Sequence, residues 1–571
     1  MIDFKEKIAI AISKITNIDA DEIKRYIEVP QNNEMGDFAF PCFKLAKELK
    51  KAPQMIAEDI KNSFFDGENA EISTYVGKAN VVGGYLNVFV KKDVYIEDVM
   101  KEAITKGSNY GRSSIGNGKT IVIDYSSPNI AKPFHIGHLR STVIGNSLYK
   151  LYDFLGYKVI GINHLGDWGM GVCRTIAGYL MWKDEYDFTT RPIDAILAIY
   201  VRYNKIEKED PDFKQHAVDA LKKLEAGDEE ITKIWKWIIE VSLENYQKIY
   251  DLMDCKFDSY NGEAFYNDKM DRVIKELEDK NLLVESEGAK VVMMDEDIPP
   301  CMILTSQGTT IYATRDLAAL LYRIDNYKFD KCLYLVASEQ SLHFKQIFET
   351  LSKMGYKEYA DRCEHIPFGL VLDEDGQKMG SRKGNATTLE EIFNESIEKS
   401  LKIIEEKNPD LEDKNKVAEK VGVGAIIFND LANSRIKDEI FDWNQILNFN
   451  GETGPYLQYT YVRTRSILRN LNEVPQEADY KLLNDKEGYE VVRLIGSFAD
   501  TVKLACDKNE PSIVSRYLLD LAKAFSRFYN EHHVICDDKN VQNARVLLTK
   551  VAGDVIKEGL SLLGIRCPEK M

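Results

Sequence analysis

Two histidines, His135 and His138, stand three residues apart with Gly137 between them. Residues 121–123 are predicted to form a buried strand, and apolar residues recur at helical spacing from Ile136 onward. Both imidazoles are therefore expected in the first turn of a helix, on one face. Helix N-termini and imidazole N–H groups favour phosphoryl oxygens, and a glycine lets a ligand approach the backbone closely. The pattern predicts a phosphate site. Two histidines that only cap or pack the helix are the alternative.

A second segment, residues 378–383, brings Lys378, Arg382 and Lys383 into one short basic loop. It follows a predicted strand over residues 368–372. Positive charge on a loop can close on a triphosphate and leave with pyrophosphate. Taken alone, the segment is equally well explained as a solvated basic turn. Together with the histidine turn, it predicts an ATP phosphate chain held from two sides, which is the chemistry of activating a carboxylate by adenylylation.

Both segments resemble the signatures of class I aminoacyl-tRNA synthetases, a His-Ile-Gly-His turn and a Lys-Met-Ser-Lys-Ser loop. Further segments are similar to sequences of one family in that class, the arginyl-tRNA synthetases: residues 126–142, 163–169, 312–316, 454–459 and 563–571. The resemblance covers essentially the whole chain. It implies an arginine–tRNA ligase that forms arginyl-adenylate from L-arginine and ATP, with Mg²⁺ accompanying the ATP. The arginyl group would then pass to the 3′ end of tRNA(Arg).

Two positions depart from the pattern of the family. Arg382 stands where the general class I loop has its second lysine, which keeps the charge but presents a planar fork. Residues 170–173 read Met-Gly-Val-Cys, where the family usually has Thr-Gln-Phe-Gly. Lys132, just before the histidine turn, resembles a lysine that assists phosphate binding in the family.

The resemblance also implies roles for single residues. Those implied in catalysis are Lys132, His135, His138, Lys378 and Arg382. Those implied in ATP binding are His135, Gly137, His138, Lys378, Met379 and Ser381. Those implied in arginine binding are Asp124, Ser126, Asn129, His138, Tyr312, Asp316 and Gln340. Those implied in tRNA binding are Tyr459, Arg463 and Tyr529.

Physical chemistry supports part of this set. A guanidinium has five donors and no acceptor, so its pocket needs carboxylate and amide oxygens. Tyr312 and Asp316 lie four residues apart in a helical pattern, which places phenol and carboxylate on one face. A helix cap or surface ion pair is the alternative for each carboxylate. Aromatic and arginine side chains over residues 456–465 can stack on bases and hold phosphates, although a helix core with a basic face has the same pattern.

The predicted fold class is multidomain α/β. Residues 1–110 are interpreted as an N-terminal α+β domain that contacts tRNA, with strands over 71–76 and 85–90; a structural cap is the alternative. Alternating strands and helices predict a Rossmann-like, parallel-sheet catalytic domain, with its first half at 111–180 and its second half, including the basic loop, at 301–395. Residues 181–300 are predicted as a mainly helical insertion, and residues 396–571 as an α-helical anticodon-binding bundle.

Composition narrows the classes further. A formal net charge of −17 argues against nonspecific coating of nucleic acid, but local basic patches can still bind tRNA. Nine cysteines without a Cys-x-x-Cys pair predict reduced thiols and no structural zinc, and we expect no metal ligands among the site residues. No apolar run approaches the ~20 residues that span a bilayer, and residues 1–7 lack targeting character. We therefore expect a cytoplasmic enzyme without membrane contact, and a monomer by resemblance.

Two other functions stay open at this point. One is a related class I ligase that adenylylates another amino acid or acid. The other is a noncatalytic tRNA-binding relative. Such a relative would be expected to have lost His135, His138 or Lys378, and all three are present.

Overall fold

The computed structural model describes residues 2–30, 35–295, 298–373, 375–376, 379 and 388–571. These residues form two compact units, each assembled from separate stretches of the chain. One unit contains Met1–Gly111, Thr464–Phe498 and Asp520–Val555. The other contains Arg112–Arg463, Ala499–Leu519 and Ile556–Met571. The histidine turn and the predicted arginine-binding residues all belong to the second unit.

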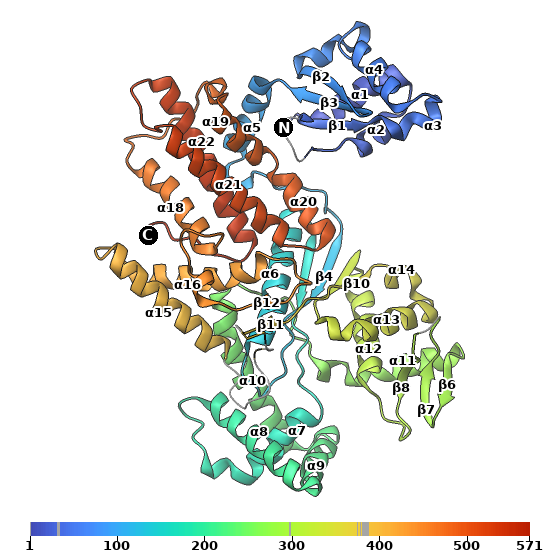
Figure 1. Cartoon of the computed structure of the whole chain (residues 1–571). Helices are drawn as coiled ribbons and strands as arrows, with labels where there is room; N and C mark the ends of the chain where they lie inside the picture. The colour runs from blue at the N-terminus through green and yellow to red at the C-terminus, as the bar shows by residue number, and fades with distance from the viewer. Residues whose placement is uncertain (1, 31–34, 296–297, 374, 377–378, 380–387) are drawn as a thin grey trace. The chain divides into compact units, whose positions relative to one another are not determined.

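A four-stranded sheet lies at the centre of the second unit (Figure 1). Its strand order is β10-β9-β4-β5, and every neighbouring pair is parallel. The bounds are β4 (Thr120–Asp124), β5 (Lys158–Ile162), β9 (Lys331–Tyr334) and β10 (Cys363–His365). In the register, Asp124 lies opposite Ile162 on one side and Tyr334 on the other, at the carboxyl edge of the sheet. This confirms the predicted Rossmann-like catalytic domain, because ligands of such sheets bind at this edge.

The helix that follows the histidine turn is buried on nearly all sides. A 3-10 turn (Ile136–His138) leads into α6 (Leu139–Phe154), in which 13 of 16 residues are buried. The buried set includes polar side chains as well as the apolar stripe expected from the sequence. Each buried polar group needs a partner. Ser141 donates to Leu335 O at 2.9 Å, and Tyr152 donates to Cys506 O at 3.0 Å.

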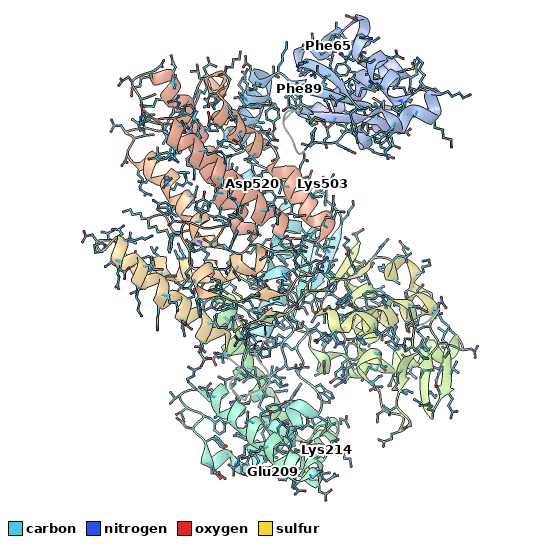
Figure 2. The ribbon with its side chains drawn as sticks, viewed as in Figure 1. Phe65, Phe89, Glu209, Lys214, Lys503 and Asp520 are labelled. Carbon is cyan, nitrogen blue, oxygen red and sulfur yellow. The ribbon has the colours of Figure 1, made fainter. Side chains whose placement is uncertain are left out.

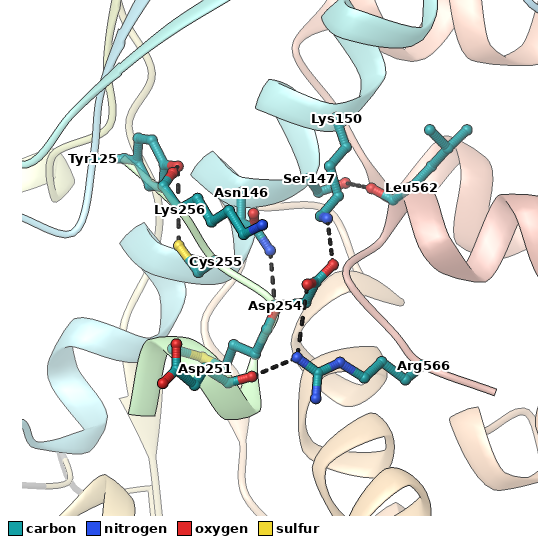
Figure 3. A network of polar contacts seen from close by, with 11 residues as sticks. Tyr125, Asn146, Ser147, Lys150, Asp251, Asp254, Cys255, Lys256, Leu562 and Arg566 are labelled. Atoms are coloured by element: carbon teal, nitrogen blue, oxygen red, sulfur yellow. Dashed lines mark hydrogen bonds and ion pairs between the residues drawn. The ribbon is translucent and has the colours of Figure 1, made fainter. Parts of the chain in front are cut away.

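A polar network fixes the side of α6 shown in Figure 3. Asn146 donates to Met253 O at 3.1 Å, and Ser147 donates to Leu562 O at 3.0 Å. The Lys150 ammonium lies 2.7 Å from the Asp254 carboxylate. The network ties α6 to the residues that follow Leu252 and to the C-terminal residues of the same unit.

The segment between β5 and β9, within which the insertion 181–300 was predicted, contains six α-helices among its described residues and also strands. Its helices are α7 (Met170–Trp182), α8 (Pro192–Glu209), α9 (Lys214–Glu225), α10 (Glu229–Leu252), α11 (Met270–Asp279) and α12 (Tyr312–Tyr327). Figure 2 labels Glu209 and Lys214 at the turn from α8 to α9. An antiparallel sheet of order β6-β7-β8 was not predicted from the sequence. Its strands are β6 (Leu283–Ser286), β7 (Ala289–Val292) and β8 (Cys301–Leu304).

The first unit contains an α+β module, also as predicted. A sheet of order β1-β3-β2 packs against helices, and Figure 2 marks Phe65 and Phe89 in this module. Its helices are α1 (Phe4–Thr16), α2 (Ala20–Tyr26), α3 (Ala46–Leu49), α4 (Pro53–Ser63) and α5 (Lys92–Lys106). Its strands are β1 (Phe38–Pro41), β2 (Val76–Val82) and β3 (Tyr85–Val90). The prediction of a strand over 71–76 was wrong at its start. Residues 67–74 form a 3-10 helix, in which polar side chains such as Ser73 bond to the local backbone.

The remaining helices follow β9. They are α13 (Ser341–Leu351), α14 (Lys357–Ala360), α15 (Leu389–Lys407), α16 (Lys414–Leu431), α17 (Trp443–Ile446), α18 (Gly454–Arg469), α19 (Lys486–Gly496), α20 (Phe498–Lys508), α21 (Ser512–Glu531) and α22 (Lys539–Leu562). This confirms the predicted helical character of the C-terminal region. Among the described residues, no helix is both long and apolar enough to cross a membrane.

One short strand differs from its prediction. The strand expected over 368–372 is reduced to β11 (Val371–Leu372), which pairs in parallel with β12 (Glu439–Ile440). The preceding backbone bonds differently: Gly369 N–H donates to Arg435 O, and Leu370 N–H donates to the Asp438 carboxylate at 2.7 Å.

Replacing Gly145 with alanine should destabilise the second unit. A Cβ at this position of α6 would lie 2.3 Å from the Tyr125 ring, and both residues are buried. We expect Gly145→Ala to lower the free energy of unfolding by about 1–3 kcal/mol, as overpacking does elsewhere. Denaturant unfolding followed by tryptophan fluorescence measures this.

The matched control is Gly171→Ala in α7, where a Cβ meets nothing within 4 Å. Because alanine has a higher helix propensity than glycine, this substitution should leave the free energy of unfolding unchanged or raise it by up to about 1 kcal/mol. Equal effects of the two substitutions would contradict the packing described here.

Candidate active site

The histidine turn is locked by its own backbone. His135 Nδ1 accepts from the Gly137 N–H at 3.1 Å, and His138 Nδ1 accepts from the His135 N–H at 3.3 Å. The two imidazole rings pack against each other at an interplanar angle of 33°, with their centroids 3.9 Å apart. Because each Nδ1 accepts a hydrogen bond, each neutral imidazole carries its proton on Nε2. The turn thus presents two Nε2–H donors from one helix start.

His138 is uncharged in the folded protein. Burial is the main cause that lowers the pKa of His138 to about 3, and the nearby His135 and Lys132 act in the same direction. Phe134 stacks on its ring with centroids 5.0 Å apart. The imidazole therefore serves as a hydrogen-bond donor of fixed orientation rather than as a cation. Lys132 supplies the positive charge nearby, with its ammonium 5.2 Å from the Tyr200 ring centroid.

Asp124, at the carboxyl end of β4, is paired inside the protein. Its Oδ2 accepts from the Arg323 guanidinium at 2.6 Å, and its Oδ1 accepts from Ser127 Oγ at 2.9 Å. The Arg323 side chain is 1% exposed. Sequence reasoning did not single out Arg323, because nothing local to α12 indicates that it points into the site. Any ligand of Asp124 must share the carboxylate with this arginine.

The turn after β4 is backbone-strained. Ser126 and Ser127 have φ of 68° and 46°, and Ala131 has φ of 62°, in the left-handed region that L-residues rarely adopt. The Ser126 hydroxyl lies 2.8 Å from the Tyr250 hydroxyl, inside the protein. Asn129 is exposed, and its backbone pairs with Gly166. This turn therefore brings Asn129, rather than the Ser126 hydroxyl, to the accessible side.

Tyr312 and Asp316 share one face of α12, as predicted. Tyr312 is 69% exposed, at the first position of the helix. One turn later, Asp316 Oδ2 lies 2.6 Å from His343 Nε2. Gln340 is exposed, in the 3-10 turn that precedes α13. Helix α12 thus presents a phenol and a carboxylate side by side.

Asp124, Asp316 and Glu263 form an acidic cluster near His164, and of these three only Glu263 was not predicted from the sequence. Burial lowers the pKa of this histidine, while Asp124 and Asp316 act in the opposite direction, so both carboxylates lie near its ring. Glu263 adds a third carboxylate, 3.4 Å from the Arg315 guanidinium. Burial raises the pKa of Glu263 to about 7, and Asp316 adds to that shift. The sequence signal for Glu263 is weak, since it begins a short 3-10 helix that is remote in sequence from every motif.

Several predicted residues lie outside the described part of the chain: Lys378, Ser381 and Arg382. Met379 is described, and its N–H donates to Val371 O at 3.0 Å. Of the residues predicted to bind tRNA, Tyr459 and Arg463 lie one turn apart on α18. The Arg463 guanidinium lies 5.0 Å from the Tyr459 ring centroid. Tyr529 belongs to the other unit and is 38% exposed.

One group among the described residues has metal-ligand spacing, formed by Asp485, Glu487 and His532. His532 Nε2 lies 3.1 Å from Asp485 and 3.4 Å from Glu487, and Arg545 donates to its Nδ1 at 3.3 Å. These contacts already satisfy both ring nitrogens. The group belongs to the first unit, whereas the histidine turn belongs to the second.

Three family models together match most of the chain. Residues 99–443 match "tRNA synthetases class I (R), catalytic domain", residues 457–571 match "DALR anticodon binding domain", and residues 3–90 match "Arginyl tRNA synthetase N terminal domain". With the parallel sheet and the histidine turn, the first match defines a class I aminoacyl-tRNA synthetase, a class that uses ATP.

Similar proteins narrow the class. The chain is 49% identical over 572 residues to an arginine–tRNA ligase of Clostridium botulinum, with 100% of both chains covered. It is 48% identical, at the same coverage, to one from Clostridium beijerinckii. Its fold is similar to Thermus thermophilus arginyl-tRNA synthetase, with a TM-score of 0.84 at 24% identity over 99% of each chain. The chain belongs to the arginyl-tRNA synthetase family, and it is a ligase that joins arginine to tRNA.

The Asp124–Arg323 pair generates a stability prediction. Removing one partner of a buried ion pair leaves an uncompensated charge, which costs about 3–5 kcal/mol. We expect Arg323→Met to lower the free energy of unfolding by about that amount. Adding Asp124→Asn should restore part of it, because the second substitution removes the orphaned charge. Denaturant unfolding of both variants measures this, and additive losses would contradict the pairing.

Proposed function

We propose how the described site divides the arginine–tRNA ligase reaction among its residues. The histidine turn would bind ATP, and two members of the acidic cluster, Asp316 and Glu263, would bind the substrate guanidinium. The observation that carries this proposal is the position of both groups around the carboxyl edge of the sheet. Asp124 ends β4 there, and the turn that follows β4 leads to His135.

On the ATP side, the proposed ligands are His135, Gly137, His138, Lys378, Met379 and Ser381, with Lys132 and Arg382 adding charge. The arginine carboxylate attacks the α-phosphorus of ATP and forms a new P–O bond. The bond between the α-phosphorus and the oxygen that bridges to the β-phosphorus breaks, and pyrophosphate leaves with that oxygen. The two Nε2–H groups are oriented before the substrate arrives, so they stabilise developing phosphoryl charge without reorganisation. Mg²⁺ would accompany ATP by coordinating its phosphate oxygens, which neutralises part of their charge.

On the arginine side, we propose that Asp316 and Glu263 accept hydrogen bonds from the substrate guanidinium. Tyr312 would cover its plane. Asp124, Ser126, Asn129, His138 and Gln340 were also predicted to bind arginine. Because the Ser126 hydroxyl bonds inside the protein and Asp124 is held by Arg323, we assign these two a supporting part around the α-ammonium group. Asn129 and Gln340 are exposed and would contact the backbone atoms of the substrate directly.

For tRNA binding, we propose domains and three residues. Residues 1–110 and 396–571 would contact tRNA(Arg), through Tyr459, Arg463 and Tyr529 among others. Residues 111–180 and 301–395 would form the catalytic domain, interrupted by the insertion 181–300. We further propose that the enzyme works as a monomer in the cytoplasm.

The direct test is ATP–pyrophosphate exchange with each amino acid, with and without total tRNA. We expect exchange with arginine alone, and His138→Ala should lower kcat about 10²–10³-fold, as expected for loss of a preorganised donor. The matched control is His216→Ala, because His216 is exposed, and this variant should keep the exchange rate of the unmodified enzyme. Exchange with another amino acid would overturn the assignment of the acidic cluster. Binding of tRNA without any exchange would indicate a noncatalytic relative.

Arginine binding should also depend on pH through Glu263. Because the pKa of Glu263 is raised to about 7, the carboxylate takes up a proton as the pH falls below 7 and then loses its attraction for a guanidinium. KM for arginine should therefore rise as the pH falls from 8 to 6. Glu263→Gln should raise KM about 10- to 100-fold and flatten that pH dependence, since it removes a charged hydrogen bond.

The control for this profile is Glu285→Gln, an exposed carboxylate on β6. It should retain the KM of the unmodified enzyme and its pH profile. A pH-dependent KM in the Glu263→Gln enzyme would remove Glu263 from the proposed pocket.

A further inference from the structure

Arg140, two residues after His138, is buried at the start of α6 and is not part of any pocket described above. Its side chain is 1% exposed. Its Nε lies 2.7 Å from Asp430 Oδ1, at the end of α16, and its Nη1 donates to Lys437 O at 2.7 Å. One guanidinium therefore joins the helix of the histidine turn to a second helix and to the chain just before β12.

The backbone at Lys437 holds the strand from which the basic loop departs. Gly369 packs directly on the Lys437 carbonyl, since a Cβ there would lie 2.6 Å from that oxygen. Leu370 N–H donates to Asp438 Oδ1 at 2.7 Å, and Glu439 N–H donates to Leu370 O at 2.8 Å. These contacts fix β11 against β12.

Strand β11 in turn carries the described residue of the loop. Met379 N–H donates to Val371 O at 3.0 Å, so this residue of the signature is bonded directly to β11. Arg140 is thus bonded to the Lys437 carbonyl, and the next two residues along the chain, Asp438 and Glu439, are bonded to Leu370, just before the strand that precedes the loop. The histidine turn stands at the other end of these contacts, two residues before Arg140.

The charges around Arg140 show why an arginine is needed there. Asp430 is 3% exposed, and Glu439 is 7% exposed with its oxygens bonded to Asn429 and Asn433 at 2.9 and 3.1 Å. Two buried carboxylates thus lie near one guanidinium. Burial raises the pKa of Glu439 to about 7, with Asp430 adding to the shift and Arg140 opposing it. A lysine in its place would keep the charge, but its single nitrogen could not reproduce the planar fork that reaches both Asp430 and the Lys437 carbonyl.

We propose that Arg140 is a positioning residue for adenylate formation. By bonding Asp430 and the Lys437 carbonyl, it sets the spacing between the histidine turn and β11, the two elements that approach ATP from opposite sides. The inference rests on the proposed role of the Lys378–Lys383 segment in phosphate binding. It concerns a residue that touches neither substrate, so its effect must appear in the rate of the chemical step rather than in substrate recognition.

The test is ATP–pyrophosphate exchange with kcat expressed per active site, counted by active-site titration. We expect Arg140→Lys to lower kcat about 10- to 100-fold, because displacing reacting groups by about 1 Å has an effect of this size. KM for arginine should change less than threefold. Asp438→Ala removes the bond to Leu370 from an exposed side chain and should fold normally, with kcat reduced in the same direction.

The matched control is Arg174→Lys, which disturbs a two-pronged ion pair between α7 and Glu207 of α8, at 2.6 and 2.8 Å. It should keep kcat per active site. Unchanged kcat in Asp438→Ala and in Arg140→Lys would overturn the inference, and so would an equal loss in Arg174→Lys. If Arg140→Lys fails to fold, Asp438→Ala decides alone.

Lys378→Ala separates this inference from the function on which it rests. If it leaves kcat unchanged, the proposed phosphate role of the loop is wrong. If it lowers kcat while Arg140→Lys and Asp438→Ala do not, the loop assignment stands and the positioning role of Arg140 falls.

Discussion

Helix α6 must satisfy polar side chains on every face while almost no face meets water. A buried hydroxyl, amide or guanidinium without a partner costs about 1–3 kcal/mol, so each one on this helix demands a specific acceptor from a neighbour. The acceptors come from distant parts of the chain: the Leu335 carbonyl, the Met253 carbonyl, the Leu562 carbonyl and the Asp430 carboxylate. A shift of the helix by one residue would break all of these bonds at once. Because His135 and His138 stand at the start of this helix, the same bonds fix their position.

The carboxylates of the acidic cluster are partly paired with the protein's own guanidiniums. Arg323 is held by Asp124, and Arg315 by Glu263, so two of the three carboxylates near His164 already have a positively charged partner. Asp316 faces His343 instead. Burial is the main cause that raises the pKa of Glu263, and the nearby Asp316 carboxylate adds to the shift. In the proposed pocket, a substrate guanidinium would compensate for both, and a neutral side chain would not.

Much of this architecture could be predicted from local patterns. The strand before Asp124, the helix after His135 and the shared face of Tyr312 and Asp316 follow from periodicities that the sequence displays directly. Other features depend on tertiary contacts. Glu263 and Arg323 enter the site from an insertion loop and from the middle of a helix, and no spacing marks them.

Errors in the prediction have the same origin. Residues 71–74 were predicted to begin a strand, but they end a 3-10 helix over 67–74, in which the Ser73 hydroxyl donates to the Ala70 carbonyl. The strand expected over 368–372 is short because the N–H groups of Gly369 and Leu370 donate to Arg435 and to the Asp438 side chain, which precede β12, rather than to the backbone of a neighbouring strand. In both cases the competing partner is invisible in the sequence alone.

The link between Ser147 and the Leu562 carbonyl also bears on how the chain is made. Ribosomes synthesise proteins from the N-terminus, so α6 emerges long before residues 562–566, which bond to it and to the adjoining Asp251–Asp254 segment. Until then, the polar groups on that side must stay hydrated, and the helix cannot settle into its final surroundings. Helix α6 is therefore translated early, but its polar contacts are completed only when the C-terminal residues have been made. A nascent chain that ends before residue 562 therefore lacks part of the surroundings that hold α6 in place.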